Sequence, residues 1–411
     1  MKKRATFFLV FCILSTLIYA QSVGEKQRFT IKGQLIGKET KLWLIYRDEN
    51  QTYHADTCTP KNGLFTFSGL LAEPTLAVLR KYQDPQEFVV MSPTNGPQAK
   101  EIFIEPGVIK VVLTEGKFKD AVITGSHSQL ENDLLIKLKQ HIINESDSLG
   151  TIYWKISKQI YETNDQSLKD KLQLECKKID RLTSKLMLEK SKKSFDFVNT
   201  HPDSFISPGE LMKIQYWFSL DTIKLLYNQM NSSVKNSRDG ISVAKIIERR
   251  ENNLVGKIAP GFTTIDVNGD TLSLSSFRGK GLVLLCFWES RRLTCKEMNL
   301  HLKEVYNKYH SKNFDIISIS NDPKVGWLRA LKEDSLLNLW HHILAKNFWL
   351  RDIGRPTEDN ILGKYDMTFT PLLILVNNEG IIVGRWDRQH TEEKEIELAL
   401  DKKLSELIKL D

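Results

Sequence analysis

One cysteine stands where a buried strand is expected to turn into a helix. Residues 283–288 (VLLCFW) form a short apolar run between polar residues, the pattern of a strand covered on both faces. A helical pattern then runs from about Thr294 to Tyr309. Cys295 therefore falls in the first helical turn, where unpaired N–H groups and the helix dipole favour an anion or a thiolate. Three cations close to it favour the thiolate too: Arg291, Arg292 and Lys296.

Thiol–disulfide exchange needs a thiolate that attacks and a second thiol that resolves the mixed disulfide. Beyond the first 20 residues the chain has four cysteines, and no two have Cys-x-x-Cys spacing: Cys58, Cys176, Cys286 and Cys295. They are too few and too widely spread for a disulfide-scaffolded fold. Two interpretations of Cys295 stay open, a lone reactive thiol and a small apolar packing residue.

The stretch resembles the active-site region of TlpA/ResA-type thioredoxin-like proteins, AhpC/TSA-related thiol-disulfide oxidoreductases of the cell envelope. Those proteins carry Phe-Trp at the end of a strand, then Ala-Ser-Trp-Cys-x-x-Cys and a helix. Phe287, Trp288 and Ser290 match, Cys295 falls on the second cysteine, and Arg292 falls on the first. In the family the first cysteine attacks and the second resolves. The resemblance thus implies a degenerate active site, and we expect ordinary dithiol activity to be lost because Arg292 cannot attack.

Two further points concern the cysteines. Cys286 occupies a position that in thioredoxins often holds a buried Asp beneath the second cysteine, so the resemblance places it near Cys295. A disulfide between them would be a relocated redox pair or a structural link; the alternative is a packed core cysteine. Peroxiredoxins place Pro-x-x-x-Thr-x-x-Cys at this helix start, and here Trp288 and Arg292 occupy the Pro and Thr positions. The peroxiredoxin match is therefore weak.

Phe369-Thr370-Pro371 matches the loop that, in this fold, carries a cis-proline facing the active site. The resemblance implies that an extended peptide can pair with the Thr370 backbone as an added strand. An ordinary trans proline at the start of a strand is the alternative. An arginine pair at a helix start could also bind a carboxylate or a phosphate. The predicted substrate-binding residues are Trp288, Arg292, Thr370 and Pro371, and the predicted ligand is a polypeptide or an anion.

The 411 residues are expected to form several domains. Short alternating strands with frequent turns predict an antiparallel β-sandwich. The order of the short motifs along this segment resembles that of the β-domain of unknown function that often precedes TlpA-like domains. Apolar residues at three- and four-residue steps then predict a helical connector, interrupted at 144–150 and suited to an arm, a small bundle or self-association. Alternating strands and helices close the chain as an α/β thioredoxin fold. The predicted segments are 1–20 (signal peptide), 21–126 (β-sandwich), 127–250 (connector) and 251–411 (thioredoxin-like domain).

Residues 1–20 have three cations, a short apolar core and a small residue at position 20, the pattern of a secretory signal. We expect an exported protein of the periplasm or cell envelope, with no transmembrane span after cleavage. The formal charge of +7 includes three cations of that segment, so the remainder carries +4 and does not suggest nucleic acid. No histidine motif suggests a metal, and no cofactor is expected. The expected partner is an envelope polypeptide or a thiol/disulfide protein; the oligomeric state stays open.

Overall fold

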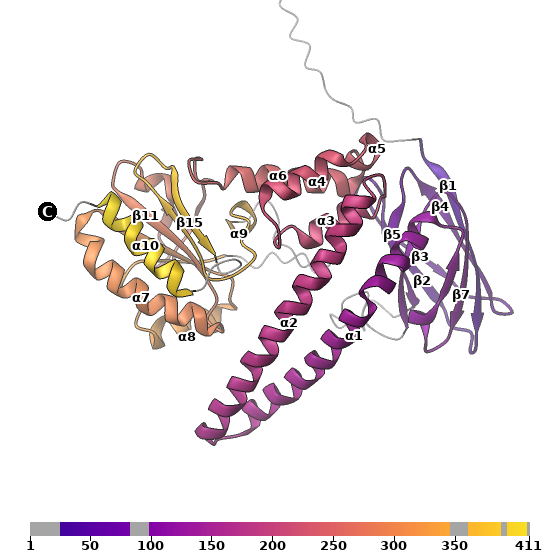
Figure 1. The fold of residues 1–411 in the computed structure, drawn as a ribbon, viewed down its shortest axis with the longest axis horizontal. Helices are drawn as coiled ribbons and strands as arrows, with labels where there is room; N and C mark the ends of the chain where they lie inside the picture. The colour runs from indigo at the N-terminus through magenta and orange to yellow at the C-terminus, as the bar shows by residue number, and fades with distance from the viewer. Residues whose placement is uncertain (1–24, 83–97, 346–360, 388–392, 409–411) are drawn as a thin grey trace, which may run out of the picture.

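The computed structural model describes residues 25–82, 98–345, 361–387 and 393–408. The predicted signal peptide lies outside these residues. The strands of the first part are β1 (Gln27–Ile36), β2 (Leu42–Arg47), β3 (Tyr53–Cys58), β4 (Leu64–Leu71), β5 (Thr75–Lys81), β6 (Ala99–Ile104), β7 (Gly107–Thr114) and β8 (Val122–Thr124). They form two four-stranded sheets, ordered β4-β1-β7-β8 and β3-β2-β5-β6. Figure 1 shows this sandwich at one end of the molecule.

The sandwich buries one face of each sheet, as alternating strands require. In β1 the inward residues include Phe29 and Ile31, which are fully buried. One pairing differs from the predicted antiparallel pattern, because β1 and β7 run parallel. Between β1 and β7 the chain crosses to the second sheet and back, so β7 can run either parallel or antiparallel to β1. Cys58 is the last residue of β3.

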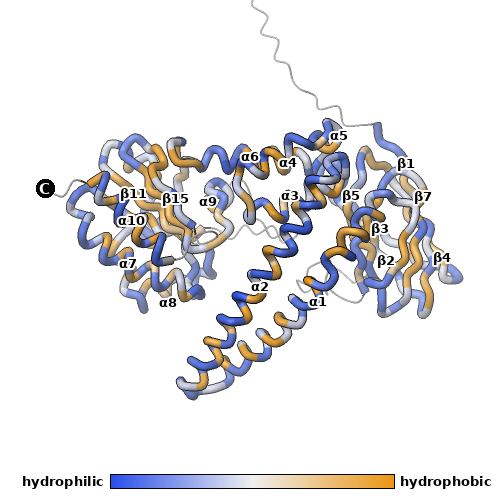
Figure 2. Tube along the Cα trace, in the orientation of Figure 1, coloured by the Kyte–Doolittle hydropathy of each residue, from blue (hydrophilic) through white to orange (hydrophobic). Residues whose placement is uncertain are grey.

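Six helices follow, and we call residues 127–253, which include the C-cap residue Asn253 of the last helix, the helical module. They are α1 (His127–Glu162), α2 (Gln166–Thr200), α3 (Ser207–Ile214), α4 (Leu220–Gln229), α5 (Ser232–Lys235) and α6 (Arg238–Asn252). α1 and α2 form a long hairpin that projects from the body, and α3–α6 pack beside the base of α2 (Figure 1). Apolar and polar stretches alternate along both arms of the hairpin (Figure 2).

The predicted interruption at 144–150 is wrong, because α1 continues through it. Two hydroxyl groups bond back to carbonyls one turn earlier, Ser148 to Asn144 and Thr151 to Asp147. Gly150 costs about 1 kcal/mol relative to Ala in a helix, and packing against α2 offsets that cost. The break lies instead at 163–165, where the Asp165 side chain accepts a hydrogen bond from the Leu168 N–H and caps α2.

The C-terminal part is a thioredoxin-like α/β domain. Its elements are β9 (Thr263–Ile265), β10 (Thr271–Ser273), β11 (Leu282–Trp288), α7 (Leu293–Tyr309), β12 (Phe314–Ser320), α8 (Lys324–Glu333), β13 (His341–Leu344), α9 (Ile361–Lys364), β14 (Leu372–Val376), β15 (Ile382–Asp387) and α10 (Glu393–Leu407). The main sheet has the order β13-β12-β11-β14-β15, with β11 parallel to β12 and antiparallel to β14. β11 is thus central and covered on both faces, as its apolar run predicts.

The two faces of β11 belong to two separate cores. Cys286 and Trp288 face the core beneath α7, α8 and α10, whereas Leu285 and Phe287 face the core on the opposite side. Gly281 precedes the strand with φ +137, and a Cβ there would lie 1.9 Å from the Asn313 carbonyl oxygen. None of the described helices combines the length and apolarity needed to cross a membrane.

The helical module touches both of its neighbours. The Arg238 N–H donates to the Glu73 carboxylate of the sandwich at 3.0 Å. At the other end Arg249 of α6 forms a 3.0 Å ion pair with Asp366 of the thioredoxin-like domain. The Asn253 amide also donates to the Lys364 carbonyl at 2.8 Å. The module therefore approaches the segment that leads into Thr370 and Pro371.

Candidate functional site

Cys295 lies in the first turn of α7, three residues after the N-cap residue Arg292, as predicted. No side chain caps this helix start. The Cys295 N–H donates to the Arg292 carbonyl oxygen at 3.1 Å. The Cys295 side chain is fully buried and shares its core with Cys286, Trp288 and Met298. The structure thus brings the two predicted cysteines onto one face of β11, and both are free thiols.

The turn between β11 and α7 is held by a buried carboxylate that the sequence analysis missed. Asp322 follows β12, the neighbour of β11, and its Oδ2 accepts a hydrogen bond from the Ser290 N–H at 2.7 Å. The same oxygen accepts from the Ser320 hydroxyl at 2.8 Å, and that hydroxyl oxygen accepts from the Asp322 N–H. The position of Asp322 just after a strand parallel to β11 is the signal that could have found it.

Burial decides the protonation of Cys295. It raises the pKa of the thiol to about 11, although the main chain at Glu289, the Thr370 side chain and Arg292 act in the opposite direction. Burial also raises the pKa of the Cys286 thiol, and the nearby Cys295 adds to the rise. Arg292 does favour the thiolate, as expected, but desolvation of the buried sulfur outweighs it, which supports the interpretation of Cys295 as a small packing residue.

We expect Cys295 and Cys286 to resist alkylation by iodoacetamide in the folded protein at pH 8, because both are buried and protonated. Cys58, which is only partly buried, should react first. Mass spectrometry after timed labelling would locate each modification, and labelling in denaturant gives the control in which all four cysteines react. Rapid labelling of native Cys295 at rates like those of Cys58 would contradict this prediction.

The predicted binding residues differ in their exposure. Arg292 is about half exposed, and its Nε donates to Glu289 at 2.9 Å. Trp288 is buried in the core, so its indole does not reach the surface. Thr370 and Pro371 are buried too, and the peptide bond between them is cis. The Thr370 main-chain N–H and C=O have no main-chain partner among the described residues, since β14 begins at Leu372.

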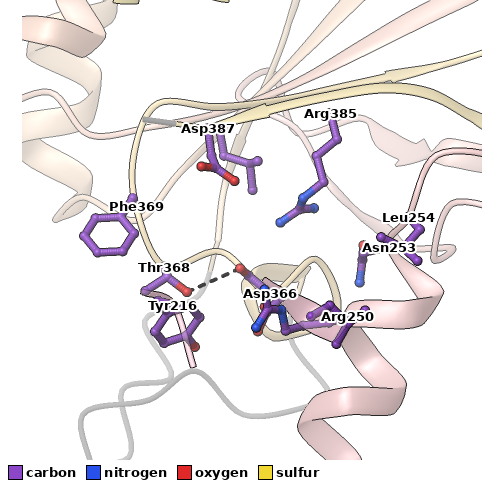
Figure 3. Close-up of a pocket in the computed structure, with 11 residues that line it drawn as sticks. Tyr216, Arg250, Asn253, Leu254, Asp366, Thr368, Phe369, Arg385 and Asp387 are labelled. Carbon is purple, nitrogen blue, oxygen red and sulfur yellow. Dashed lines mark hydrogen bonds between the residues drawn. The ribbon is translucent and has the colours of Figure 1, made fainter. Parts of the chain in front are cut away.

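A pocket that the sequence analysis missed opens beside this segment, where the helical module meets the thioredoxin-like domain (Figure 3). We call it the junction pocket. Tyr216 and Phe369 lie edge to face in it, with ring centroids 6.4 Å apart. No local pattern connects its residues, because they come from distant stretches of the chain. They are Tyr216, Leu220, Arg250, Asn253, Leu254, Asp366, Thr368, Phe369, Leu372, Arg385 and Asp387.

In the part of the chain that the structure describes, no three His, Cys, Asp or Glu side chains are grouped so that they could bind a metal ion. The adjacent His341 and His342 point in opposite directions from β13, and only His342 is buried. Within the described part of the domain, the chemically distinctive groups are therefore the two thiols, the arginines, and the Thr370 backbone without a main-chain partner.

Comparison with known proteins identifies two regions. Residues 29–132 match the "Domain of unknown function (DUF4369)", and residues 255–383 match the "AhpC/TSA family". A thiol-disulfide oxidoreductase ResA of Bacillus thuringiensis subsp. konkukian is 35% identical over 151 residues, covering 36% of this chain and 77% of that protein. A Bacillus cereus ResA is 27% identical over 150 residues, covering 35% and 76%.

Among solved structures, a thiol-disulfide oxidoreductase from Bacteroides fragilis is 30% identical, covering 37% of this chain and 99% of that one, with a TM-score of 0.29. The thioredoxin domain of a Bacteroides vulgatus thiol-disulfide oxidoreductase is 29% identical, covering 36% and 96%, with a TM-score of 0.30. The sequence relatives are matched over most of their own length by the domain that carries Cys295. The chain therefore belongs to the TlpA/ResA-type thioredoxin-like proteins, with a DUF4369 domain on the N-terminal side.

Proposed function

We propose that this protein is exported to the cell envelope and that its thioredoxin-like domain binds an extended polypeptide without dithiol exchange. The binding face comprises Arg292 and the Thr370–Pro371 segment. One observation carries the proposal: an arginine stands where the family's attacking cysteine would be, and the remaining Cys295 is fully buried with a raised pKa. A protonated thiol beneath the surface cannot start the exchange, because the thiolate is the nucleophile.

The Thr370 backbone supports the binding half of the proposal. Its N–H and C=O have no main-chain partner among the described residues, although the side chain is buried. Unpaired backbone groups beside a strand are the groups that an extended peptide uses when it adds to a sheet. Arg292 lies at the start of α7 with part of its guanidinium free of Glu289, so it adds a cationic contact. Export is inferred from the signal-like residues 1–20.

The proximity of Cys286 and Cys295 favours a second candidate, a relocated redox pair. Both side chains lie in one core cluster, and Cys295 adds to the rise in the pKa of Cys286. In this reaction the two thiols would lose two protons and two electrons and form one disulfide, while a partner disulfide would be reduced to two thiols. The burial of both thiols opposes the reaction, since the partner sulfur must reach one of them.

Restoring the missing cysteine tests the loss of dithiol chemistry. We expect the mature protein to show background rates with a disulfide-linked peptide and dithiothreitol, and Arg292→Cys to catalyse the reduction. The new thiol would lie at the exposed N-cap with Cys295 three residues away, which is the family's spacing. Turnover is followed by the fluorescence of a peptide quenched across its disulfide.

Arg291→Cys is the matched control, since it adds an exposed thiol one residue from the required spacing; it should stay at background. Cys295→Ser in the Arg292→Cys background should remove the gained turnover. Turnover by the unmodified protein that disappears in Cys286→Ser or Cys295→Ser would overturn the proposal and favour the relocated redox pair.

A further inference from the structure

The junction pocket contains two arginines whose positions are fixed by main-chain carbonyls. Arg250 of α6 donates to the Gln215 oxygen at 2.6 Å and to the Phe218 oxygen at 3.4 Å. Arg385 of β15 donates through both terminal nitrogens to the Tyr365 oxygen at 3.3 Å. A guanidinium has five N–H donors, so these contacts hold each group in place and leave donors for a ligand.

The charge around the pocket is not balanced. Asp366 and Asp387 line it, but Asp366 is already paired with Arg249, which lies 3.0 Å away on α6. Among the described residues, the two lining carboxylates are therefore shared by three arginines: Arg250 and Arg385 in the pocket and Arg249 behind it. Burial lowers the pKa of Arg250 and of Arg385 in spite of both aspartates, which indicates cations that are desolvated and only partly compensated. One additional negative charge would balance the charges of the three arginines.

Asn253 supplies an unused acceptor at the same place. It is 2% exposed, and its Nδ2 donates to the Arg249 and Lys364 carbonyl oxygens at 2.8 Å each. Its Oδ1 is buried and has no hydrogen-bond partner among the described residues. A buried acceptor without a donor costs about 1–3 kcal/mol, so a ligand N–H at this position would be favourable.

The pocket also adjoins the proposed peptide-binding segment. Thr368 and Phe369 line it and are followed directly by Thr370, whose main-chain N–H and C=O have no main-chain partner among the described residues. Figure 3 shows Phe369 and Tyr216 on one side of the pocket, with Arg250 and Arg385 reaching in from α6 and from β15. A peptide paired with Thr370 would thus place a neighbouring residue at the arginines.

We propose that the junction pocket binds a carboxylate of the polypeptide that pairs with Thr370. Arg250 and Arg385 donate to the carboxylate oxygens, and Asn253 Oδ1 accepts a peptide N–H. The carboxylate comes from an acidic side chain or from the C-terminus of the polypeptide. The proposal rests on the peptide-binding function above and adds its specificity: the helical module, through Arg250 and Asn253, selects acidic partners.

The test is a fluorescence anisotropy screen of the mature protein with a library of disulfide-free octapeptides. Each sequence is made in four forms, with Glu or Gln at one position and with a free or an amidated C-terminus. We expect the carboxylate forms of binding peptides to bind about tenfold or more tightly than the matched amides, the value for a charge-assisted hydrogen-bonded pair. This preference should fall in Arg250→Gln and in Arg385→Gln.

Arg329→Gln is the control, since Arg329 is an exposed arginine on α8 outside the pocket. The measured quantity is the carboxylate-to-amide affinity ratio, which a general loss of stability would not change selectively. A Glu/Gln preference would assign the pocket to a side chain, and sensitivity to amidation would assign it to a C-terminus; either supports the proposal. Peptides that bind with no preference for either carboxylate would overturn it and leave the peptide-binding function intact. A library without any binder would overturn both.

Discussion

Glu210→Gln is expected to destabilise the helical module by about 3–5 kcal/mol, the cost of removing one partner of a buried ion pair. Glu210 of α3 is 4% exposed at its side chain and lies 2.6 Å from the ammonium group of Lys139 on α1, itself 7% exposed. The Ser194 hydroxyl of α2 donates to the same carboxylate at 2.7 Å. One carboxylate thus joins three helices, and its loss leaves the Lys139 charge buried without a counter-charge. Urea unfolding followed by circular dichroism measures the effect.

The same group makes stability depend on acid. Burial alone would raise the pKa of Glu210, but Lys213 and Lys139 outweigh it and lower the pKa to about 2 from 4.5. The unfolded chain then binds the proton first, so the contribution is complete above pH 4.5 and is lost as pH falls toward 2. The loss should reach roughly 3 kcal/mol and should be absent in Glu210→Gln.

Two variants separate this explanation from a general sensitivity of α3. Lys213 also contacts Glu210, at 2.8 Å, but its side chain is 68% exposed, so Lys213→Ala should cost less than about 1 kcal/mol. The double variant Lys139→Met/Glu210→Leu replaces the pair by apolar groups and should recover most of the stability lost in Glu210→Gln. A Glu210→Gln protein as stable as the unmodified one would contradict the prediction.

Local pattern is enough for the centre of the thioredoxin-like domain. Residues 283–288 are apolar without alternation because β11 is central and covered on both faces, and α7 begins one residue before the predicted start. The degenerate motif could also be located, since it depends only on the spacing of Arg292 and Cys295. The low helix propensity of Asn, Ser and Gly predicts an interruption at 144–150. The helix α1 continues through these residues because packing across the α1–α2 hairpin stabilises it.

The properties of the site depend on groups that local patterns do not connect. Cys295 is buried in a core to which β11, α8, α10 and its own helix all contribute, and this burial outweighs the effect of the neighbouring Arg292. The junction pocket joins Tyr216 and Arg250 of the helical module to Asp366 and Arg385 of the domain, so it exists only where the two parts meet. The spacing of residues in the sequence does not predict such long-range contacts, so the pocket could be identified only from the structure.

His342 should make the thioredoxin-like domain lose roughly 3 kcal/mol of stability between pH 6.5 and 4. The ring is fully buried on β13, and its Nε2 lies 2.9 Å from the Leu336 carbonyl oxygen, so the neutral ring donates there. Its Nδ1 is buried with no partner among the described residues, so a second proton would have no acceptor. Burial accordingly lowers the pKa of His342 to about 4 from 6.5.

The sign follows from the two states of the protein. Above pH 6.5 the ring is neutral in both states, and stability does not depend on it. Below that value His342 binds a proton in the unfolded chain, whereas in the folded domain it stays neutral until the pH falls to about 4. Stability therefore falls across this window. Thermal or urea unfolding at half-unit pH steps would measure the decline. Glu210 acts mainly in the lower window from 4.5 to 2 and in another part of the molecule.

His342→Gln should remove the decline, because the glutamine amide can donate to the Leu336 oxygen but does not titrate. The neighbouring His341 is the matched control. The Asp315 carboxylate, 3.6 Å from the His341 Nε2, raises the pKa of His341, so its contribution has the opposite sign and is lost as pH rises through and above 6.5. His341→Gln should therefore keep the decline that His342 causes. Equal declines in the unmodified protein and in His342→Gln would show that another group is responsible, and the buried Nδ1 would then have no role in the acid sensitivity of this domain.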